Sequence, residues 1–378
     1  MNKKLLILAV GAALAAGSVT ANAGMKIGGY ANVSADSMNN GVNSGSYISS
    51  NASNVVISGS TDLGNGMSAI FSAQTFLSLG SANNPASTSP YNDAGFQYDA
   101  FGNGDTYAGL QSNFGLVALG RNDTPMKILG RQVDLFGNEI GDSRNLTAGP
   151  NGVNDFDLRP GHSAFYVSPS FAGVQVRAAY ETENANGAPS VTTAGEDPVT
   201  TTPLGGGPKM HMDDLSATWT GGPVFAGVAY ERDSVPNVSS QVSNLRVAAA
   251  VNFKPFKVTA LVQHEANLVE GAGATAKTGS QNVFGIGAAF TFLGSNTVKA
   301  QYYKADDVAG VTNTGAHMVD VGFDHAFSKT TTVYVDYAKT TNQSEAGYTA
   351  FNPGHGNSMP TAMGQSPHAV SVGMIYTF

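Results

Sequence analysis

The sequence predicts an all-β fold, a transmembrane antiparallel β-barrel of 16 strands, and three observations support this prediction. Charged residues make up only 12% of the 378 residues, about half the share of a soluble domain, while glycine occurs 46 times. After residue 23, no stretch is apolar for the roughly 18 residues that a membrane helix requires. Segments of about ten residues alternate between apolar and polar side chains along most of the chain. A closed barrel explains all three, because it pairs every backbone group and exposes only alternate side chains to lipid.

The N-terminal segment has the three parts of a secretory signal peptide. Two lysines precede an apolar run at residues 5–16, and the small residues Ala21 and Ala23 stand where signal peptidase cuts. The apolar run is shorter than the roughly 20 residues of a membrane-spanning helix. We therefore expect residues 1–23 to be removed and residues 24–378 to form one barrel domain. An uncleaved N-terminal anchor is the alternative.

Composition limits the partners and the chemistry. The formal net charge is −8 for the whole chain, and it becomes about −10 once the two N-terminal lysines leave 17 of the 19 bases against 27 acids. An acidic chain argues against nucleic acid as a partner, because phosphate binding requires a basic patch. The chain has no cysteine, and its seven histidines lack metal-binding spacing. With no nucleophile motif either, we expect no metal, no cofactor and no catalytic residue.

The alternation is clearest in residues 244–253. Its apolar side chains share one face and its polar ones the other: Leu245, Val247, Ala249, Val251 and Phe253 against Asn244, Arg246 and Asn252. Residues 174–181 and 332–337 alternate in the same way. A helix would scatter these charges around its axis. We therefore expect the apolar face to meet lipid and the polar face to line an aqueous lumen.

Counting such segments from the first to the last gives the 16 expected strands. They cover residues 25–36, 52–62, 67–79, 104–114, 115–123, 161–170, 173–183, 211–220, 223–233, 243–253, 256–267, 280–292, 296–306, 316–327, 330–341 and 367–378. Short turns alternate with long polar connections at about 80–103, 124–160, 184–210 and 342–366, which is the asymmetry of outer-membrane barrels. A secreted β-sandwich is the alternative, but it would need a continuous apolar core instead of polar inner faces.

Four stretches carry recognisable turns. "VISGSTDLGNGMSAIFSAQ" (56–74) contains Asp-Leu-Gly-x-Gly, "YAGLQSNFGLVALGRNDTP" (107–125) ends its hairpin with Leu-Gly-Arg, "FYVSPSFAGVQVRAAY" (165–180) contains Ser-Pro-x-Phe-x-Gly, and "FDHAFSKTTTVYVDYA" (323–338) contains Phe-Ser-Lys. Together, and in this order, they resemble the general porins of Gram-negative bacteria, of the neisserial and betaproteobacterial type. The resemblance runs through the mature chain from end to end.

The resemblance implies a homotrimer of water-filled channels in the bacterial outer membrane, passed by ions and small hydrophilic solutes. Lipid, lipopolysaccharide and the outer-membrane assembly machinery would be its partners, and the connection at about 80–103 would latch onto a neighbouring subunit. The third long connection, about 124–160, would fold into the barrel and narrow it. That loop holds the acidic residues Asp134, Glu139, Asp142, Asp155 and Asp157. We expect the first three to face Arg121 and Arg159 on the wall, where the opposed charges orient water and solutes.

The chain departs from the anion-selective members of that family. Those members carry an arginine where this chain has Asn54, and basic residues near the positions of Asp105 and Thr106. With a mature charge near −10, we expect a weak cation preference, because negative wall charge repels anions at close quarters. The alternative is that the acids lie on outer loop surfaces and selectivity is negligible.

The last ten residues, "AVSVGMIYTF" (369–378), alternate up to Phe378. We expect them to be the sixteenth strand, which closes the barrel against the first, with Ile375 as the one break in the alternation. By resemblance, Phe378 is also the signal that the assembly machinery reads. Two rival functions remain: a substrate-selective channel with a lumen binding site, and an outer-membrane β-barrel enzyme.

Overall fold

The computed structural model describes residues 24–79, 101–149, 156–181, 211–234, 241–270, 277–351 and 354–378. The expected signal peptide at 1–23, most of the expected subunit latch at 80–103 and the connection at 184–210 lie outside these residues. Among the described residues, no helix combines the length and the apolar character needed to cross a membrane.

The described residues form one antiparallel sheet with two short helices. The strands are β1 Gly24–Asn39, β2 Ser44–Ser50, β3 Asn54–Gly64, β4 Met67–Phe76, β5 Thr106–Ser112, β6 Gly115–Arg121, β7 Ser163–Val167, β8 Val174–Glu181, β9 Met212–Gly221, β10 Val224–Asp233, β11 Val242–Phe253, β12 Phe256–Glu270, β13 Lys277–Phe292, β14 Asn296–Ala305, β15 Ala316–Ala326, β16 Thr331–Asn342 and β17 His368–Thr377. The helices are α2 Pro125–Arg131 and α3 Arg144–Thr147, both between β6 and β7.

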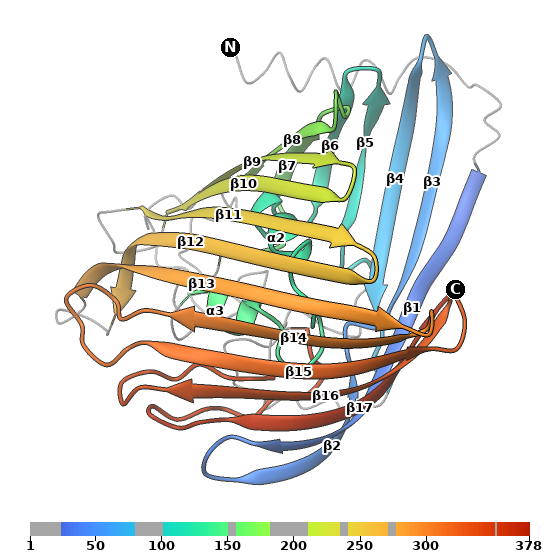
Figure 1. Cartoon of the computed structure of the whole chain (residues 1–378). Helices are drawn as coiled ribbons and strands as arrows, with labels where there is room; N and C mark the ends of the chain where they lie inside the picture. Colours follow the sequence, from blue (N-terminus) through green and yellow to red (C-terminus); the bar gives the residue numbers. More distant parts are fainter. Residues whose placement is uncertain are drawn as a thin grey trace.

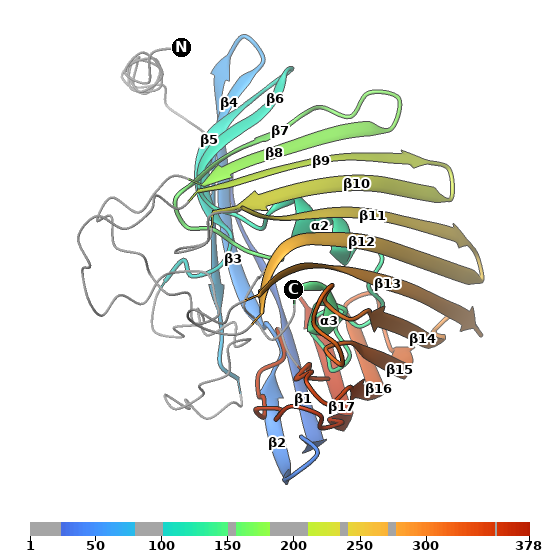
Figure 2. The ribbon, with the colours of Figure 1, turned by 90° about the vertical axis from the view of Figure 1, so that its left-hand side faces the viewer.

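The sheet closes on itself (Figures 1 and 2). Strand β1 pairs with β3, each strand from β3 to β16 pairs with the next along the chain, and β17 returns to β1. The ring therefore has 16 strands, as the sequence predicts, and the expected bounds agree with the observed ones to within three residues. Sixteen strands leave room for a lumen, whereas eight would be filled by side chains.

Strand β2 is an element that the sequence did not reveal. It pairs with the second half of β1, while β3 pairs with the first half, so β2 and β3 share one partner. The break between them falls at residues 51–53, where Asn51 N donates to Asn32 O (2.8 Å) and Ser53 Oγ to the same oxygen (2.9 Å). Ala52 has a φ of 50°, which turns the chain at this point.

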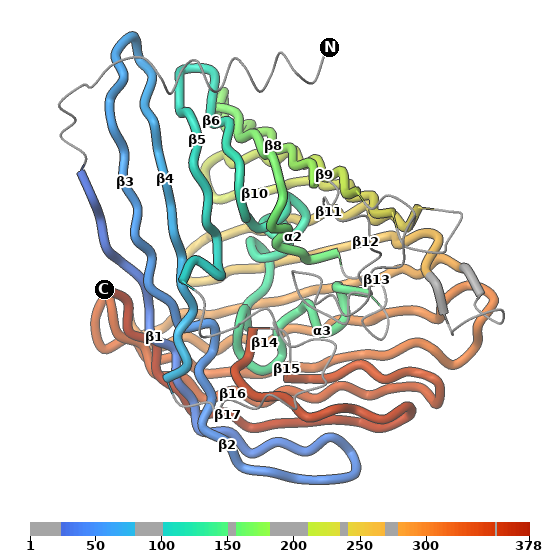
Figure 3. Tube along the Cα trace, turned by 180° about the vertical axis from the view of Figure 1, so that it is seen from behind, coloured from blue at the N-terminus to red at the C-terminus, as the bar shows by residue number. Residues whose placement is uncertain are grey.

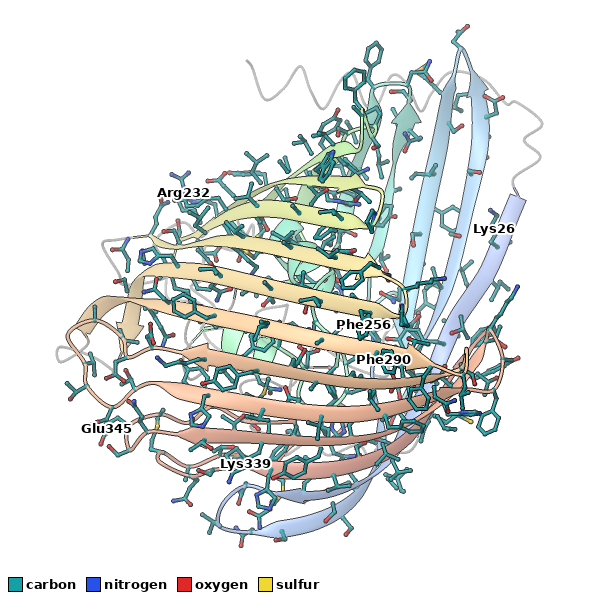
Figure 4. The ribbon with its side chains drawn as sticks, viewed as in Figure 1. Lys26, Arg232, Phe256, Phe290, Lys339 and Glu345 are labelled. Atoms are coloured by element: carbon teal, nitrogen blue, oxygen red, sulfur yellow. The ribbon has the colours of Figure 1, made fainter. Side chains whose placement is uncertain are left out.

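The two faces of the sheet differ in the way the alternation predicts. On β11, Leu245 and Val247 are 44% and 50% exposed, whereas Asn244 and Arg246 are fully buried. Phenylalanines at the short-turn rim form a belt, with the rings of Phe256 and Phe290 4.9 Å apart (Figure 4). The outer face is therefore apolar with an aromatic rim, as lipid contact requires.

The closing strand behaves as predicted. Residues Val370, Val372 and Met374 are about half exposed, while Ser371 between them is buried. The register pairs Tyr30 of β1 with Thr377 of β17, and Phe378 exchanges backbone hydrogen bonds with Gly29 (3.1 and 3.2 Å). The prediction that the last strand closes the barrel against the first is confirmed.

Candidate pore-narrowing site

The segment between β6 and β7, residues 122–162, is called the third loop here; the structure describes its residues 122–149 and 156–162, which lie on the polar face of the sheet. Figure 3 shows α2 and α3 on the concave side of the strands from β10 to β15. Thr124 caps α2 by accepting from Lys127 N (3.2 Å), and Pro125 occupies the first helical turn, where it costs no hydrogen bond. Five fully buried apolar residues of the loop pack into one cluster with Ala248 of β11 and Leu261 of β12; they are Met126, Leu129, Val133, Leu146 and Phe156.

Arg246 of β11 is the main attachment of the third loop to the wall. Its guanidinium contacts both oxygens of Asp157, at 2.7 and 3.0 Å, and donates to the backbone oxygens of Met126 and Thr147, each at 3.1 Å. Its Nε donates to Gln263 of β12 (2.7 Å). Burial alone would raise the pKa of Asp157, but the neighbouring guanidinium holds that pKa below its ordinary value. One arginine thus fixes both ends of the loop's helical part.

Gly130 shows how closely Arg246 approaches α2. A Cβ built on Gly130 would lie 2.6 Å from Nη1 of Arg246. Only a residue without a side chain lets the helix come this near the guanidinium. Alternation predicts that Arg246 faces the lumen, but it does not indicate that Arg246 attaches the third loop.

Lys299 of β14 is the second attachment. Its ammonium lies 2.7 Å from Glu139 of the third loop, 3.1 Å from Asp324 and 3.6 Å from Asp336. It also lies 4.5 Å from the ring centre of Phe136. The buried partner of Glu139 is therefore a lysine that was not predicted from the sequence. Lys299 could have been noticed because it is the single basic residue on the otherwise neutral inner face of β14.

Asp134 and Asp142 shape the loop from within. Asp134 accepts from the backbone and the hydroxyl of Ser143, each at 3.0 Å, and Asp142 pairs with Arg144 at 2.8 Å. Asp142 also accepts from Asn138 N (2.7 Å). Burial and the nearby Asp142 raise the pKa of Asp134 to about 6, so this carboxyl group titrates close to neutral pH.

Arg159 lies at the base of the loop. Its Nε is 2.8 Å from Asp105 and 2.9 Å from Asp123, and its guanidinium lies over the ring of Phe76 at 5.1 Å. Asp123 is buried, yet surrounding cations that include Arg131 hold its pKa below the ordinary value.

Four of the five predicted site residues therefore fall into three groups, and Arg121 lies outside them. Arg159 meets Asp105 and Asp123, Glu139 meets Lys299, and Asp134 and Asp142 meet Ser143 and Arg144. Arg121 ends β6 at the foot of the loop, half-buried and in register with Thr106. Among the described residues, no cluster of three or more histidine or acidic side chains could hold a metal ion.

This architecture can be compared with known proteins. A sequence profile described as Gram-negative porin matches residues 8–345. The chain belongs to the Gram-negative porin family. The porin is therefore an outer-membrane channel protein, and its family and fold point to a channel and not to an enzyme. A search of curated protein sequences finds no match.

Solved structures share the porin's fold. An anion-selective porin from Comamonas acidovorans is 20% identical with a TM-score of 0.72, covering 94% of this chain and 100% of its own. OmpT of Vibrio cholerae, in its trimer form, is 14% identical with a TM-score of 0.63, covering 94% and 99%. Salmonella typhi OmpF, in complex with daunomycin, is 14% identical with a TM-score of 0.62, covering 94% and 97%. At these identities the likeness concerns the fold.

Proposed function

We propose that the porin is a passive diffusion channel for ions and small hydrophilic solutes, narrowed by its third loop. The observation that carries this proposal is the attachment of that loop to the polar face of a closed barrel through Arg246 and Lys299. A segment held across the lumen reduces the area open to solutes, and charged groups on it act on ions that pass.

The residues proposed for the narrowing are Arg121, Arg159, Asp134, Glu139 and Asp142. Asp134 lies on the third loop and is half-buried, so its part is to act on solutes directly, while Arg121 is half-buried at the end of β6. Glu139, Asp142 and Arg159 are more than nine-tenths buried and paired, so their part is to hold the loop in place.

We further propose a weak cation preference. Among the described residues, ten buried carboxyl groups stand against five buried lysines and arginines: Asp36, Asp123, Glu139, Asp142, Asp157, Asp214, Glu231, Glu265, Asp320 and Asp336 against Lys127, Arg144, Arg159, Arg246 and Lys299. Those carboxyl groups that are ionised favour cations over anions at close quarters. The anion-selective relative from Comamonas acidovorans is only 20% identical, so its selectivity need not extend to this chain.

Assembly completes the proposal. We propose a homotrimer in contact with lipopolysaccharide, in line with the trimer form of the OmpT structure. Residues 1–23 would direct export, and Phe378 would be read by the assembly machinery. Deleting Phe378 should then reduce the yield of folded trimer in cells, while a normal yield would contradict this role.

The experiment is a planar-bilayer recording of the purified protein in potassium chloride. We expect large conductance steps that occur in groups of three. In a salt gradient, we expect a small reversal potential whose sign shows that potassium passes more readily than chloride. A reversal potential that favours chloride would contradict the cation preference alone. The absence of any conductance would overturn the channel, and saturable block by one solute would instead show a substrate-selective pore.

A further inference from the structure

The connection between β16 and β17, residues 343–367, is buried in a way that a solvated surface loop is not. Four of its side chains, Ala346, Tyr348, Ala350 and Phe351, are at most 1% exposed. We call this connection the last loop; the structure describes its residues 343–351 and 354–367.

The last loop contacts the inner face of the wall on both sides of its own strands. On one side, Tyr348 Oη donates to Gln281 of β13 (3.1 Å). On the other, Asn357 Nδ2 donates to Ser49 Oγ of β2 (2.9 Å), and Gly356 N donates to Asn51 (3.0 Å). Strands β14, β15, β16, β17 and β1 lie between these contacts, so the last loop extends along the inside of the wall over five strands.

The last loop also rests on the third loop. Gly141 N of the third loop donates to Ala350 O (2.8 Å). Phe351 and Ala350 pack in one cluster with Ile140, and all three are fully buried. Contact at this point places the last loop against the same part of the third loop that carries Glu139.

A buried ionisable pair anchors the part of the last loop that lies beside β1 and β2. Nε2 of His355 lies 3.3 Å from Oδ2 of Asp36 on β1, and both side chains are completely buried. The same carboxylate accepts from Ser371 of β17 (2.7 Å) and from Ser49. Its ion pair and hydrogen bonds thus join the last loop, β1, β2 and β17.

We propose that the last loop is a second pore-narrowing element, seated on the third loop, so that both loops together set the open area of the channel. The proposal rests on the proposed channel function. It assigns to Ala350 and His355 a positioning role, because they hold the last loop against the third loop and the wall.

The first test removes residues 347–363. Gly364 N already donates to Ala346 O (2.8 Å), so a short glycine bridge can join these two residues without moving β16 or β17. We expect a larger single-channel conductance than that of the unaltered chain, and faster entry of larger sugars into proteoliposomes. An unchanged conductance in the deletion variant would overturn the proposal that the last loop narrows the pore, but not the proposed channel function. If the unaltered chain does not conduct, the proposed channel function itself is overturned.

The second test avoids any large deletion and uses the absence of cysteine from the chain. A thiol reagent is applied to folded Ala350→Cys protein in vesicles, with Glu345→Cys as the control, because Glu345 is exposed on the same loop (Figure 4). We expect Ala350→Cys to react at least about tenfold more slowly, which corresponds to an opening free energy of about 1.4 kcal/mol. Equal labelling rates would show that the last loop is not seated on the third loop, and would overturn the proposal.

Discussion

The third loop and the last loop lie on the same inner face but are held there by different forces. The third loop is attached by full charges, through Arg246 with Asp157 and Lys299 with Glu139. Among its described residues, the last loop is attached mainly by neutral hydrogen bonds and apolar side chains, together with the ionisable pair of His355 and Asp36.

This difference determines how firmly each loop is held. Removing one partner of a buried ion pair leaves an uncompensated charge and costs about 3–5 kcal/mol, whereas a typical neutral hydrogen bond contributes about 0.5–1.5 kcal/mol. The third loop should therefore keep its place under most conditions. The last loop should respond to smaller changes in sequence and in pH.

The largest effect should follow Arg246→Met. This substitution leaves Asp157 buried without its cation, and we expect the free energy of unfolding to fall by about 3–5 kcal/mol. Urea unfolding of the barrel in lipid vesicles measures it. The control is Arg232→Gln, because Arg232 pairs with Asp213 at the exposed end of β10, where an ion pair contributes little (Figure 4). Equal losses in the two variants would contradict the attachment by Arg246.

A somewhat smaller effect should follow Lys299→Met. Three carboxyl groups then lose their shared cation, and we expect the middle of the third loop to shift and the single-channel conductance to change. The control is Lys339→Gln, which removes an equal charge from an exposed position on β16 (Figure 4). A conductance change of the same size in the control would show that net charge, and not the attachment, is responsible.

The half-buried Asp134 should give the cation preference a pH dependence. Its folded pKa is raised to about 6, so the carboxyl group is ionised at pH 7.5 and protonated at pH 5. We expect the reversal potential in a potassium chloride gradient to move towards zero as the pH falls across this range. In Asp134→Asn the shift should shrink. An identical shift in both proteins would place the titrating group elsewhere.

The smallest effect concerns His355. Burial lowers its pKa, but Asp36 outweighs burial and Glu139 adds to the increase, so the folded pKa lies above the ordinary value. The stability from the charged pair is then fully present below about pH 6.5 and is lost as the pH rises through the folded pKa. Thermal unfolding of the unaltered chain and of His355→Gln should therefore differ more at pH 6 than at pH 9. A difference independent of pH would contradict the charged pair.

The sequence predicted the barrel because alternation is a local property. Each strand carries its own apolar and polar faces, so Leu245 and Arg246 could be assigned to opposite faces without a structure. Strand β2 lacked this signal, since Ser44–Ser50 consists mainly of serine and glycine with only two large side chains. Its pairing depends on the second half of β1, which no local pattern shows.

The contacts of the third loop could not be predicted in the same way. Arg246 and Asp157 are 89 residues apart in the chain, and Lys299 and Glu139 are 160 apart. Alternation places a basic residue on the inner face, but it does not say which loop residue lies opposite. The resemblance to porins directed attention to the third loop, whereas the contacts of Lys299 and Arg246 with it are visible only in the folded arrangement.

The central claim is that the porin is a passive channel whose open area is limited by loops on its inner face. Swelling rates of proteoliposomes in sugars of increasing size test this most directly. The account predicts swelling rates that fall steadily as the sugar becomes larger and that rise in proportion to the sugar concentration. When residues 347–363 are removed, larger sugars should enter than enter through the unaltered chain. No swelling with any sugar, or a rate that saturates for one sugar alone, would contradict it.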